Sequence, residues 1–353
     1  MSTSGVGQIL ESLVGSRTPG ISYTALGSNG PLLLYNSGLA DIRHQCCVDA
    51  ATTWNAYSMS KTVTAAAALV AVQNGLIGLD DPMERFIGST PYGPLVTVRQ
   101  LLAHTSGLPN PIPLRWVHAV SDRDFGESRS LSVILKRNRK LTARPGERYA
   151  YSNLGYWLLG EIIARAAASS FPVFVREHVL RPLQIQDTDL SYVILDPAHH
   201  ANGYLEKYSV MNLMKWCLID RRLIGTYEGN WLRIEPHYVN GPAFGGLIGT
   251  VGGFERFLRD QLRSQSVLFG DATRALFYEQ QHTLSGRAIP MTLGWHMGSL
   301  GHLPYYFKEG GGAGFHCMMR VYRSAGIATI VMANATGLHA GHVLDLVDHL
   351  ILR

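Results

Sequence analysis

The two ends of this chain carry the same kind of pattern, and this feature constrains the fold most. Near the N-terminus, apolar residues at helical spacing over 6–15 precede two short strands that we predict at 21–27 and 31–37. Near the C-terminus, predicted strands at 313–322 and 327–334 precede an amphipathic helix over 341–352. Strands from the two ends can join in one domain, so we expect the termini to fold together.

The middle of the chain has a different pattern. Residues 80–192 are mostly helical in periodicity, with Pro and Gly breaks, whereas 196–300 is ambiguous. We therefore expect an α+β fold in which residues 1–79 and 196–353 form a discontinuous sheet domain, with a mostly helical domain inserted at 80–195.

The composition excludes several classes of protein. Of the 353 residues, 46% are hydrophobic and 16% are charged, which is the opposite of a disordered chain. The sequence has no apolar run long enough for a transmembrane helix, and residues 1–20 lack the basic and apolar regions of a secretory signal. We expect a cytoplasmic protein without a membrane partner.

The net charge of +5 gives little support to a nucleic-acid partner. The clearest basic run, over 136–148, has no interleaved aromatic residues and no nucleic-acid motif. A solvated surface is the favoured interpretation of this run, and contact with an anionic partner is the alternative. We expect no nucleic-acid partner, and the oligomeric state is left open.

Metal and cofactor motifs are also missing from the sequence. The four cysteines have no CxxC spacing, and no HExxH motif occurs. The glycine-rich stretch 310–314 lacks the Lys-Ser/Thr of a phosphate-binding loop. We therefore expect neither a metal nor a cofactor.

Ser58 and Lys61 open an Ala-rich helix that we predict over 59–74. Residues i and i+3 share a helix face, so Lys61 would lie beside Ser58. A serine is a weak nucleophile until a base takes its proton, and a desolvated, neutral lysine can do so. With 25 Ser and six Lys, chance alone would produce such a pair less than once, so the motif alone is weak evidence.

A second element is Tyr151-Ser152-Asn153, which follows a loop and precedes a helical stretch. The tyrosine could relay a proton, and the Asn153 amide could hold Lys61 and donate to a substrate carbonyl. The spacing also occurs at Tyr238 and Asn240, but the loop-to-helix context favours Tyr151.

A third element is Lys308-Glu309-Gly310, followed by Gly311. Lys308 would supply positive field to the site, and the Gly311 N–H could stabilise an oxyanion. The alternative for Lys308 is a surface lysine paired with Glu309.

These three elements occur in the order found in the class C β-lactamase-like serine hydrolases, and the chain resembles that group. The group includes class C β-lactamases, D,D-peptidases and family VIII carboxylesterases. Flanking segments are similar to the group as well, namely Leu101–Leu108 (LLAHTSGL), Leu79–Pro82 (LDDP), Tyr151–Gly160 and Gly245–Leu247 with Thr250.

The resemblance implies an antiparallel sheet flanked by helices, beside a helical domain, with the active site between them. It implies that Ser58 is the nucleophile and that Lys61 and Tyr151 move its proton, without saying which is the base. It also implies that Asn153 positions substrate and Lys61, and that the N–H groups of Ser58 and Gly311 form the oxyanion hole. His104 is then structural.

Glu309 departs from the Lys-Thr-Gly motif of the lactamases. A carboxylate facing the site would repel the carboxylate of a penicillin or a peptide. We therefore expect a family VIII-type carboxylesterase acting on short-chain or uncharged small-molecule esters. The alternatives are a β-lactamase, a D,D-peptidase, an amidase or an acyltransferase with the same residues, and a non-catalytic protein that kept the fold.

Other residues are expected around the site. The aromatic residues that could shape a pocket, or alternatively pack in the core, are Tyr57, Trp116, Tyr305, Tyr306 and Phe307. The prolines that suggest a rigid loop beside it are Pro109, Pro111 and Pro113.

Overall fold

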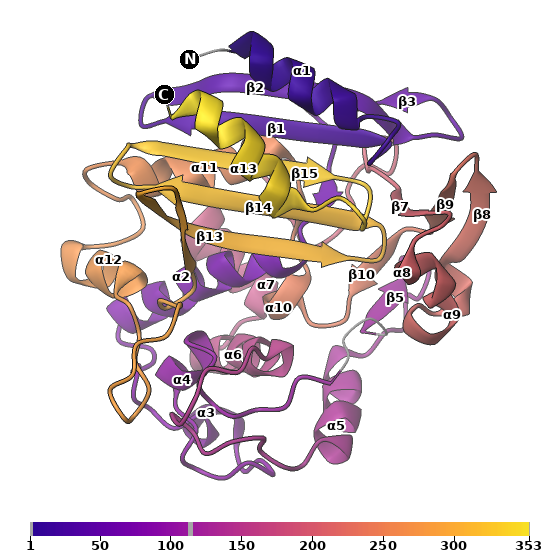
Figure 1. Ribbon diagram of the computed structural model, residues 1–353. Helices are drawn as coiled ribbons and strands as arrows, with labels where there is room; N and C mark the ends of the chain where they lie inside the picture. The colour runs from indigo at the N-terminus through magenta and orange to yellow at the C-terminus, as the bar shows by residue number, and fades with distance from the viewer. Residues whose placement is uncertain (1–2, 112–115, 353) are drawn as a thin grey trace.

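A computed structural model describes residues 3–111 and 116–352 of the protein. Its largest element is a seven-stranded sheet in the order β12-β13-β14-β15-β1-β2-β3, in which all neighbours are antiparallel (Figure 1). The strands are β1 (Gly20–Gly27), β2 (Gly30–Asp41), β3 (Cys46–Cys47), β12 (His296–Leu300), β13 (Leu303–Gly312), β14 (Phe315–Tyr322) and β15 (Ile327–Ala333).

Strands β1 and β15 join the two ends of the chain at the centre of this sheet. They pair along their length, with Tyr23 opposite Val331. The predicted antiparallel sheet is confirmed, and the four strands expected from the sequence correspond to β1, β2, β14 and β15. The sequence prediction missed β3, β12 and β13. The glycines at the end of β13 have low strand propensity and hide that strand in the sequence.

Two terminal helices cover one face of the sheet. Helices α1 (Thr3–Leu13) and α13 (Ala340–Ile351) pack against each other and lie in front of the strands in Figure 1. Their apolar residues, which recur at helical spacing, are buried together with Ile21 and Tyr23 of β1. Both helices agree with the sequence prediction to within a few residues.

The opposite face carries the helices that position the site. Helix α11 (Val251–Leu262) contacts β1 and β15, and helix α2 (Ser60–Gln73) contacts β13. Twelve of the fourteen residues of α2 are buried, including four consecutive alanines. Because the helix is enclosed on all sides, its sequence has no polar face, and its small side chains let neighbouring elements approach closely.

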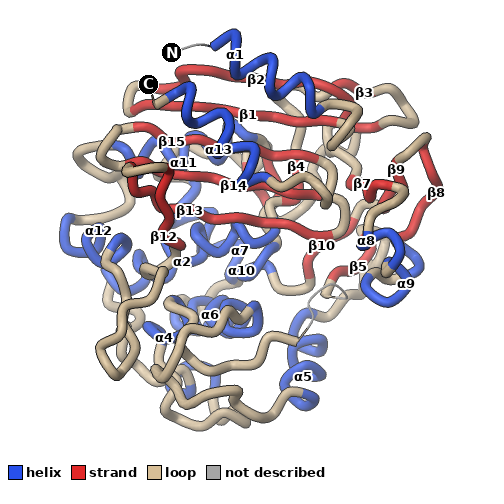
Figure 2. The backbone as a smooth tube through the Cα atoms, viewed as in Figure 1, coloured by secondary structure: helices blue, strands red, loops and turns tan. Residues whose placement is uncertain are grey.

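The remaining helices lie mostly below the sheet in the view of Figure 2. They are α3 (Glu84–Ile87), α4 (Val98–Leu102), α5 (Glu127–Arg137), α6 (Asn153–Ala166), α7 (Phe171–Val175), α8 (Val210–Leu213), α9 (Lys215–Leu218), α10 (Pro242–Gly245) and α12 (Asp271–Tyr278). Helices α2 and α10, which lie outside the 80–195 segment in sequence, pack against α6 inside it. The proposed division into two domains remains a prediction.

Three small sheets complete the fold. Strand β11 (Ile248–Gly249) lies between β4 (Trp54–Asn55) and β6 (Leu190–Ser191), and β5 (Val117–Ala119) pairs with β10 (His237–Val239). The third contains β7 (Gly203–Glu206), β9 (Trp231–Ile234) and β8 (Ile224–Glu228). The ambiguous region 196–300 thus contributes short strands as well as helices.

Within residues 3–111 and 116–352, no single helix has both the length and the apolar composition needed to cross a bilayer. Two helical segments meet the length and composition criteria only when taken together, namely Asn153–Ala166 and Phe171–Leu180. The pair is bent by 78°.

Candidate active site

Ser58 lies in a single 3-10 turn, Tyr57–Met59, directly before helix α2. Main-chain hydrogen bonds hold this turn, since Ala56 N donates to Leu247 O at 2.9 Å and Met59 N donates to Ala56 O at 3.1 Å. Leu247 N in turn donates to Ser60 Oγ at 3.0 Å. The Gly245–Leu247 segment noted in the sequence is therefore hydrogen-bonded to the residues on both sides of Ser58.

Tyr57 adopts a left-handed backbone conformation, with φ of 45°. A bulky residue takes this conformation only where its surroundings hold it there. His237 provides one such constraint, because its Nε2 lies 2.6 Å from the Tyr57 hydroxyl. His237 Nδ1 lies 2.9 Å from Glu235 O and must donate there, so Nε2 is the acceptor of the Tyr57 hydrogen bond. No sequence signal pointed to His237.

Strand β13 passes unusually close to the serine turn at Gly310. A Cβ atom on Gly310 would lie 2.1 Å from the carbonyl oxygen of Ala56. Only glycine allows this approach. The end of β13, which carries the Lys308-Glu309-Gly310 motif, therefore lies next to the turn that contains Ser58.

The structure brings Ser58, Lys61 and Tyr151 together. Lys61 Nζ donates to Ser58 Oγ at 2.9 Å, and the Tyr151 hydroxyl donates to Ser58 Oγ at 2.8 Å. Lys61 comes from the first turn of α2, and Tyr151 precedes Ser152, the N-cap of α6. A helix residue and a residue just before a second helix, far apart in the sequence, thus place a lysine and a tyrosine at one serine.

Burial sets the protonation states of these groups. Lys61 is fully buried, and desolvation together with the charge of Lys308 holds its pKa well below the usual value. Burial also lowers the pKa of Lys308 to about 7. The pKa of Tyr151 is raised by burial, although its hydrogen bond to Ser58 opposes the shift. A neutral amine beside a protonated phenol is therefore the favoured state near neutral pH.

His104 supports Tyr151 from behind. Its ring lies 4.4 Å from the Tyr151 ring between centroids, and its Nδ1 accepts a hydrogen bond from Ser152 N at 3.2 Å. The histidine is buried, and desolvation holds its pKa well below the usual value, so it is neutral. These contacts agree with the structural role expected from the sequence.

Asn153 does not hold Lys61 as the sequence analysis expected. Its Nδ2 donates to Asn110 Oδ1 at 3.2 Å, and its Oδ1 is buried without a partner among the described residues. Lys61 instead donates to the carbonyl oxygen of Phe244 at 2.6 Å. A main-chain oxygen replaces the expected side chain, and only the substrate contact of Asn153 remains a prediction.

Lys308 and Glu309 point to opposite sides of β13. Lys308 is fully buried, and its Nζ has no hydrogen-bond partner within the described part of the chain. The alternative of a surface lysine paired with Glu309 is therefore wrong. Glu309 keeps 45% of its side chain exposed and accepts a hydrogen bond from His316 Nε2 at 2.8 Å.

Two cavities meet at Ser58 and Gly311. The smaller one has a volume of about 80 Å³ and is lined by apolar side chains, including Trp116 and Phe244, together with Asn153. The larger one has a volume of about 550 Å³ and is open, with Tyr151 and Glu309 in its wall. Because Ser58 and Gly311 line both, a scissile carbonyl held between them would have one substituent in each cavity.

The structure places only some of the predicted aromatic and proline residues beside the site. Tyr57 and Trp116 line the smaller cavity, and Phe307 lines the larger one. Tyr305 instead lies over Arg320, with its ring centroid 4.4 Å from the guanidinium carbon, and Tyr306 packs against Tyr278. Of the loop prolines, Pro109 accepts a hydrogen bond from Ser152 Oγ, whereas Pro113 lies outside the described residues.

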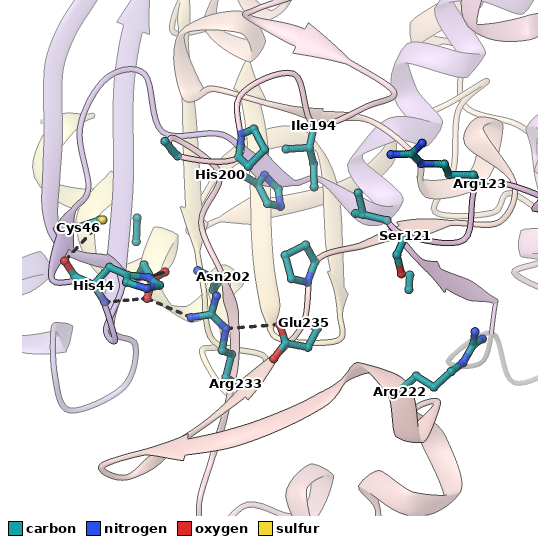
Figure 3. Close-up of a pocket in the computed structure, with 17 residues that line it drawn as sticks. His44, Cys46, Ser121, Arg123, Ile194, His200, Asn202, Arg222, Arg233 and Glu235 are labelled. Atoms are coloured by element: carbon teal, nitrogen blue, oxygen red, sulfur yellow. Dashed lines mark hydrogen bonds and ion pairs between the residues drawn. The ribbon is translucent and has the colours of Figure 1, made fainter.

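Another cavity, with a volume of about 940 Å³, lies elsewhere (Figure 3). None of the seven predicted site residues lines it. Its buried Arg233 is paired with Asp41 at 3.1 Å and with Glu235 at 3.7 Å, and His200 points into it (Figure 3). The charge of Arg233 in this cavity is thus met by carboxylates.

The family model described as Beta-lactamase matches residues 6–352. The chain belongs to the β-lactamase family. Penicillin-binding protein 4* of Bacillus subtilis (strain 168) is 27% identical over 279 residues, which are 77% of this chain and 58% of that protein. The match thus spans little more than half of that relative's length.

Solved structures of family-like proteins share the fold. The octameric penicillin-binding protein homologue from Pyrococcus abyssi has a TM-score of 0.80 at 20% identity, covering 100% of this chain and 78% of that one. The D-amino acid amidase from Ochrobactrum anthropi SV3 has a TM-score of 0.77 at 20% identity, covering 99% and 98%. At these identities the likeness concerns the fold alone.

Proposed function

We propose that this β-lactamase-family serine hydrolase is a carboxylesterase that forms an acyl-enzyme at Ser58 and acts on esters of short acyl groups. One observation carries the proposal: the Ser58 hydroxyl is within hydrogen-bonding distance of both a buried lysine amine and a partly buried tyrosine hydroxyl. This pair provides a base and an acid for acyl transfer at one oxygen.

Lys61 is the better base of the two. Its pKa is lowered and that of Tyr151 is raised, so the amine is free to accept a proton while the phenol keeps its own. Rotation of the Ser58 hydroxyl toward the Lys61 lone pair lets the serine lose its proton as its oxygen attacks the ester carbonyl. The Phe244 carbonyl holds the amine in place for this step.

The oxyanion of the tetrahedral intermediate would lie between Ser58 and Gly311. Both residues line both cavities, and in this proposal their backbone N–H groups donate to the oxyanion. The N-terminal end of helix α2 adds a partial positive charge at this point.

In this proposal Tyr151 is the proton donor to the leaving group. Its hydroxyl is 2.8 Å from Ser58 Oγ and faces the larger cavity. It would pass a proton to the departing alkoxide and receive it back by way of Lys61. A water molecule entering from the open cavity then hydrolyses the acyl-enzyme by the reverse proton path.

The cavities favour short esters without a carboxylate. A volume of about 80 Å³ equals that of about three water molecules, which suits a short acyl chain. Glu309 in the other cavity repels the carboxylate that a penicillin or a peptide C-terminus would bring. These two features support the family VIII-type esterase over a β-lactamase or a D,D-peptidase.

The test compares p-nitrophenyl butyrate with a chromogenic cephalosporin, for wild type and Ser58→Ala. We expect ester turnover that falls by several orders of magnitude in the variant, with little cephalosporin turnover. Cephalosporin turnover as fast as ester turnover would make the protein a β-lactamase. Turnover of neither compound would favour a peptidase, an amidase, an acyltransferase or a non-catalytic role.

A further inference from the structure

The larger cavity at Ser58 is the leaving-group side of the site, if the proposed acyl transfer at Ser58 holds. Tyr151, the proton donor to the departing group, is in the wall of this cavity and not in the wall of the smaller one. The acyl chain therefore occupies the smaller cavity, and the alcohol portion of the ester occupies the larger one.

A carboxylate faces this leaving-group cavity. Glu309 lies two residues before Gly311 on β13, so both point to the same face, roughly 7 Å apart along the strand. When the ester carbonyl is held at Gly311, a substituent only a few bonds along the alcohol portion would reach Glu309. His316, opposite Gly311 on β14, fixes the carboxylate by its hydrogen bond of 2.8 Å.

The carboxylate is ionised, and its partner in the described part of the cavity wall is His316. The hydrogen bond from His316 holds the pKa of Glu309 below its usual value, and His339 and Arg320 add to this effect. Among the described residues that line the cavity, Glu309 is the only Asp, Glu, Lys or Arg. The two lysines of the site are buried behind Ser58 and Tyr151 and do not line the cavity.

Aromatic rings form much of the remaining wall. Tyr151, His296 and Phe307 line the cavity, and the ring centroids of His296 and Phe307 are 5.1 Å apart. Aromatic faces attract organic cations, and they do so most strongly where water is partly excluded. A carboxylate beside aromatic rings suits an ammonium group better than a neutral or a negative one.

We propose that the leaving alcohol of the substrate carries a positive charge, and that Glu309 selects it. The substrates are then short-acyl esters of amino alcohols or quaternary ammonium alcohols. The reaction is ordinary ester hydrolysis, in which the acyl group passes from the cationic alcohol to Ser58 and then to water.

The test uses acetylcholine and neohexyl acetate, which differ only in a positive nitrogen in place of a neutral carbon. We expect wild type to favour acetylcholine in kcat/KM, and Glu309→Gln to reduce that preference by about fivefold. The comparison uses the ratio of kcat/KM for acetylcholine to kcat/KM for neohexyl acetate within each protein, so a general loss of activity in Glu309→Gln cancels. The exposed Glu279 provides a control, and Glu279→Gln should keep the wild-type preference.

A measurement on wild type alone covers the case in which Glu309→Gln fails to fold. Choline should inhibit hydrolysis of p-nitrophenyl acetate more strongly than neohexyl alcohol does. Equal inhibition by the two alcohols, or a preference for neohexyl acetate over acetylcholine, overturns the selection of a cation while leaving the esterase in place. Failure to hydrolyse p-nitrophenyl acetate at all overturns the esterase and, with it, the cationic substrate.

Discussion

Lys61 reaches Ser58 across one turn of helix, with its Nζ 2.9 Å from Ser58 Oγ. Replacing it by methionine keeps an apolar stem in the buried site but removes the base. We expect Lys61→Met to lower kcat/KM for p-nitrophenyl acetate by about 10²- to 10⁴-fold. Lys61→Arg should not restore activity, because a guanidinium stays protonated.

The exposed Lys136 on α5 provides the matched control, and Lys136→Met should keep wild-type activity. Circular dichroism would check that each variant is folded. Activity of Lys61→Met within tenfold of wild type would transfer the role of base to Tyr151.

Lys308 is a buried amine without a hydrogen-bond partner among residues 3–111 and 116–352, so its charged form destabilises the folded state. Burial lowers its pKa to about 7, whereas an unfolded lysine titrates near 10.4. Between these values the unfolded state binds the additional proton, so this residue makes stability rise with pH. We expect Lys308→Met to be more stable than wild type near pH 7, by about 1–3 kcal/mol.

Urea unfolding of both proteins at pH 7 and pH 9 measures this effect. The advantage of Lys308→Met should shrink at the higher pH, because releasing the wild-type lysine's proton on folding costs less free energy as pH rises. An advantage that is independent of pH would mean that Lys308 is not titrating in this range.

The sequence was sufficient to predict the parts of the fold that rest on periodicity. Strands β1, β2, β14 and β15 alternate or carry turn signals, and α13 has an apolar stripe, so each was predicted within a few residues. Ser58, Lys61 and Tyr151 could be proposed because their motifs occur in a fixed order. Their meeting at 2.8–2.9 Å is a property of the fold that no spacing alone could establish.

The sequence could not predict contacts that depend on main-chain atoms or on strand pairing. The carbonyl of Phe244 holds Lys61, and any residue there would offer the same oxygen. The direction of Lys308 and Glu309 depends on the pairing of β13 with β14, and a one-residue change would exchange their faces. The glycines after them give no alternation from which that pairing could be read.

Gly310 lets β13 pass the serine turn, and a Cβ there would lie 2.1 Å from Ala56 O. Gly310→Ala must push the strand or the turn away, so we expect a lower melting temperature together with a large loss of kcat. Gly252→Ala is the control, because its Cβ would meet only Thr250 Oγ1, at 3.7 Å, within helix α11. That variant should be as stable as wild type or more stable, since alanine favours helix. Equal changes of melting temperature and kcat in Gly310→Ala and Gly252→Ala would contradict the close approach of β13 to the serine turn.

Histidines with lowered pKa values should make the protein sensitive to acid, namely the buried His104, His200 and His237 and the half-buried His296. Burial lowers the pKa of His200 to about 3, of His237 to about 4 and of His296 to about 2. An unfolded histidine titrates near 6.5, so stability is complete above that pH and is lost as pH falls toward the folded values. Each proton taken up on unfolding adds about 1.4 kcal/mol per pH unit to the slope near pH 5.

The slope is measured by urea unfolding between pH 4.5 and pH 6.5. His200→Asn should lower the slope of unfolding free energy against pH by the contribution of about one proton. The same change at the exposed His302 should leave the slope unchanged. A slope that His200→Asn leaves intact would show that this histidine is accessible to protons in the folded state.

Trp116 sets the size of the smaller cavity, where it packs edge-on against Trp157 and Phe244 at 5.7 and 5.6 Å between ring centroids. Wild type should therefore prefer acetate and butyrate esters to octanoate esters. Trp116→Leu enlarges the cavity and should raise the octanoate-to-acetate ratio of kcat/KM by about tenfold, the effect of roughly one accommodated methylene. The half-exposed Trp216 serves as control, and Trp216→Leu should leave the ratio at its wild-type value. If the ratio stays constant in Trp116→Leu as well, the acyl chain does not bind in this cavity, and the assignment of the two cavities must be reversed.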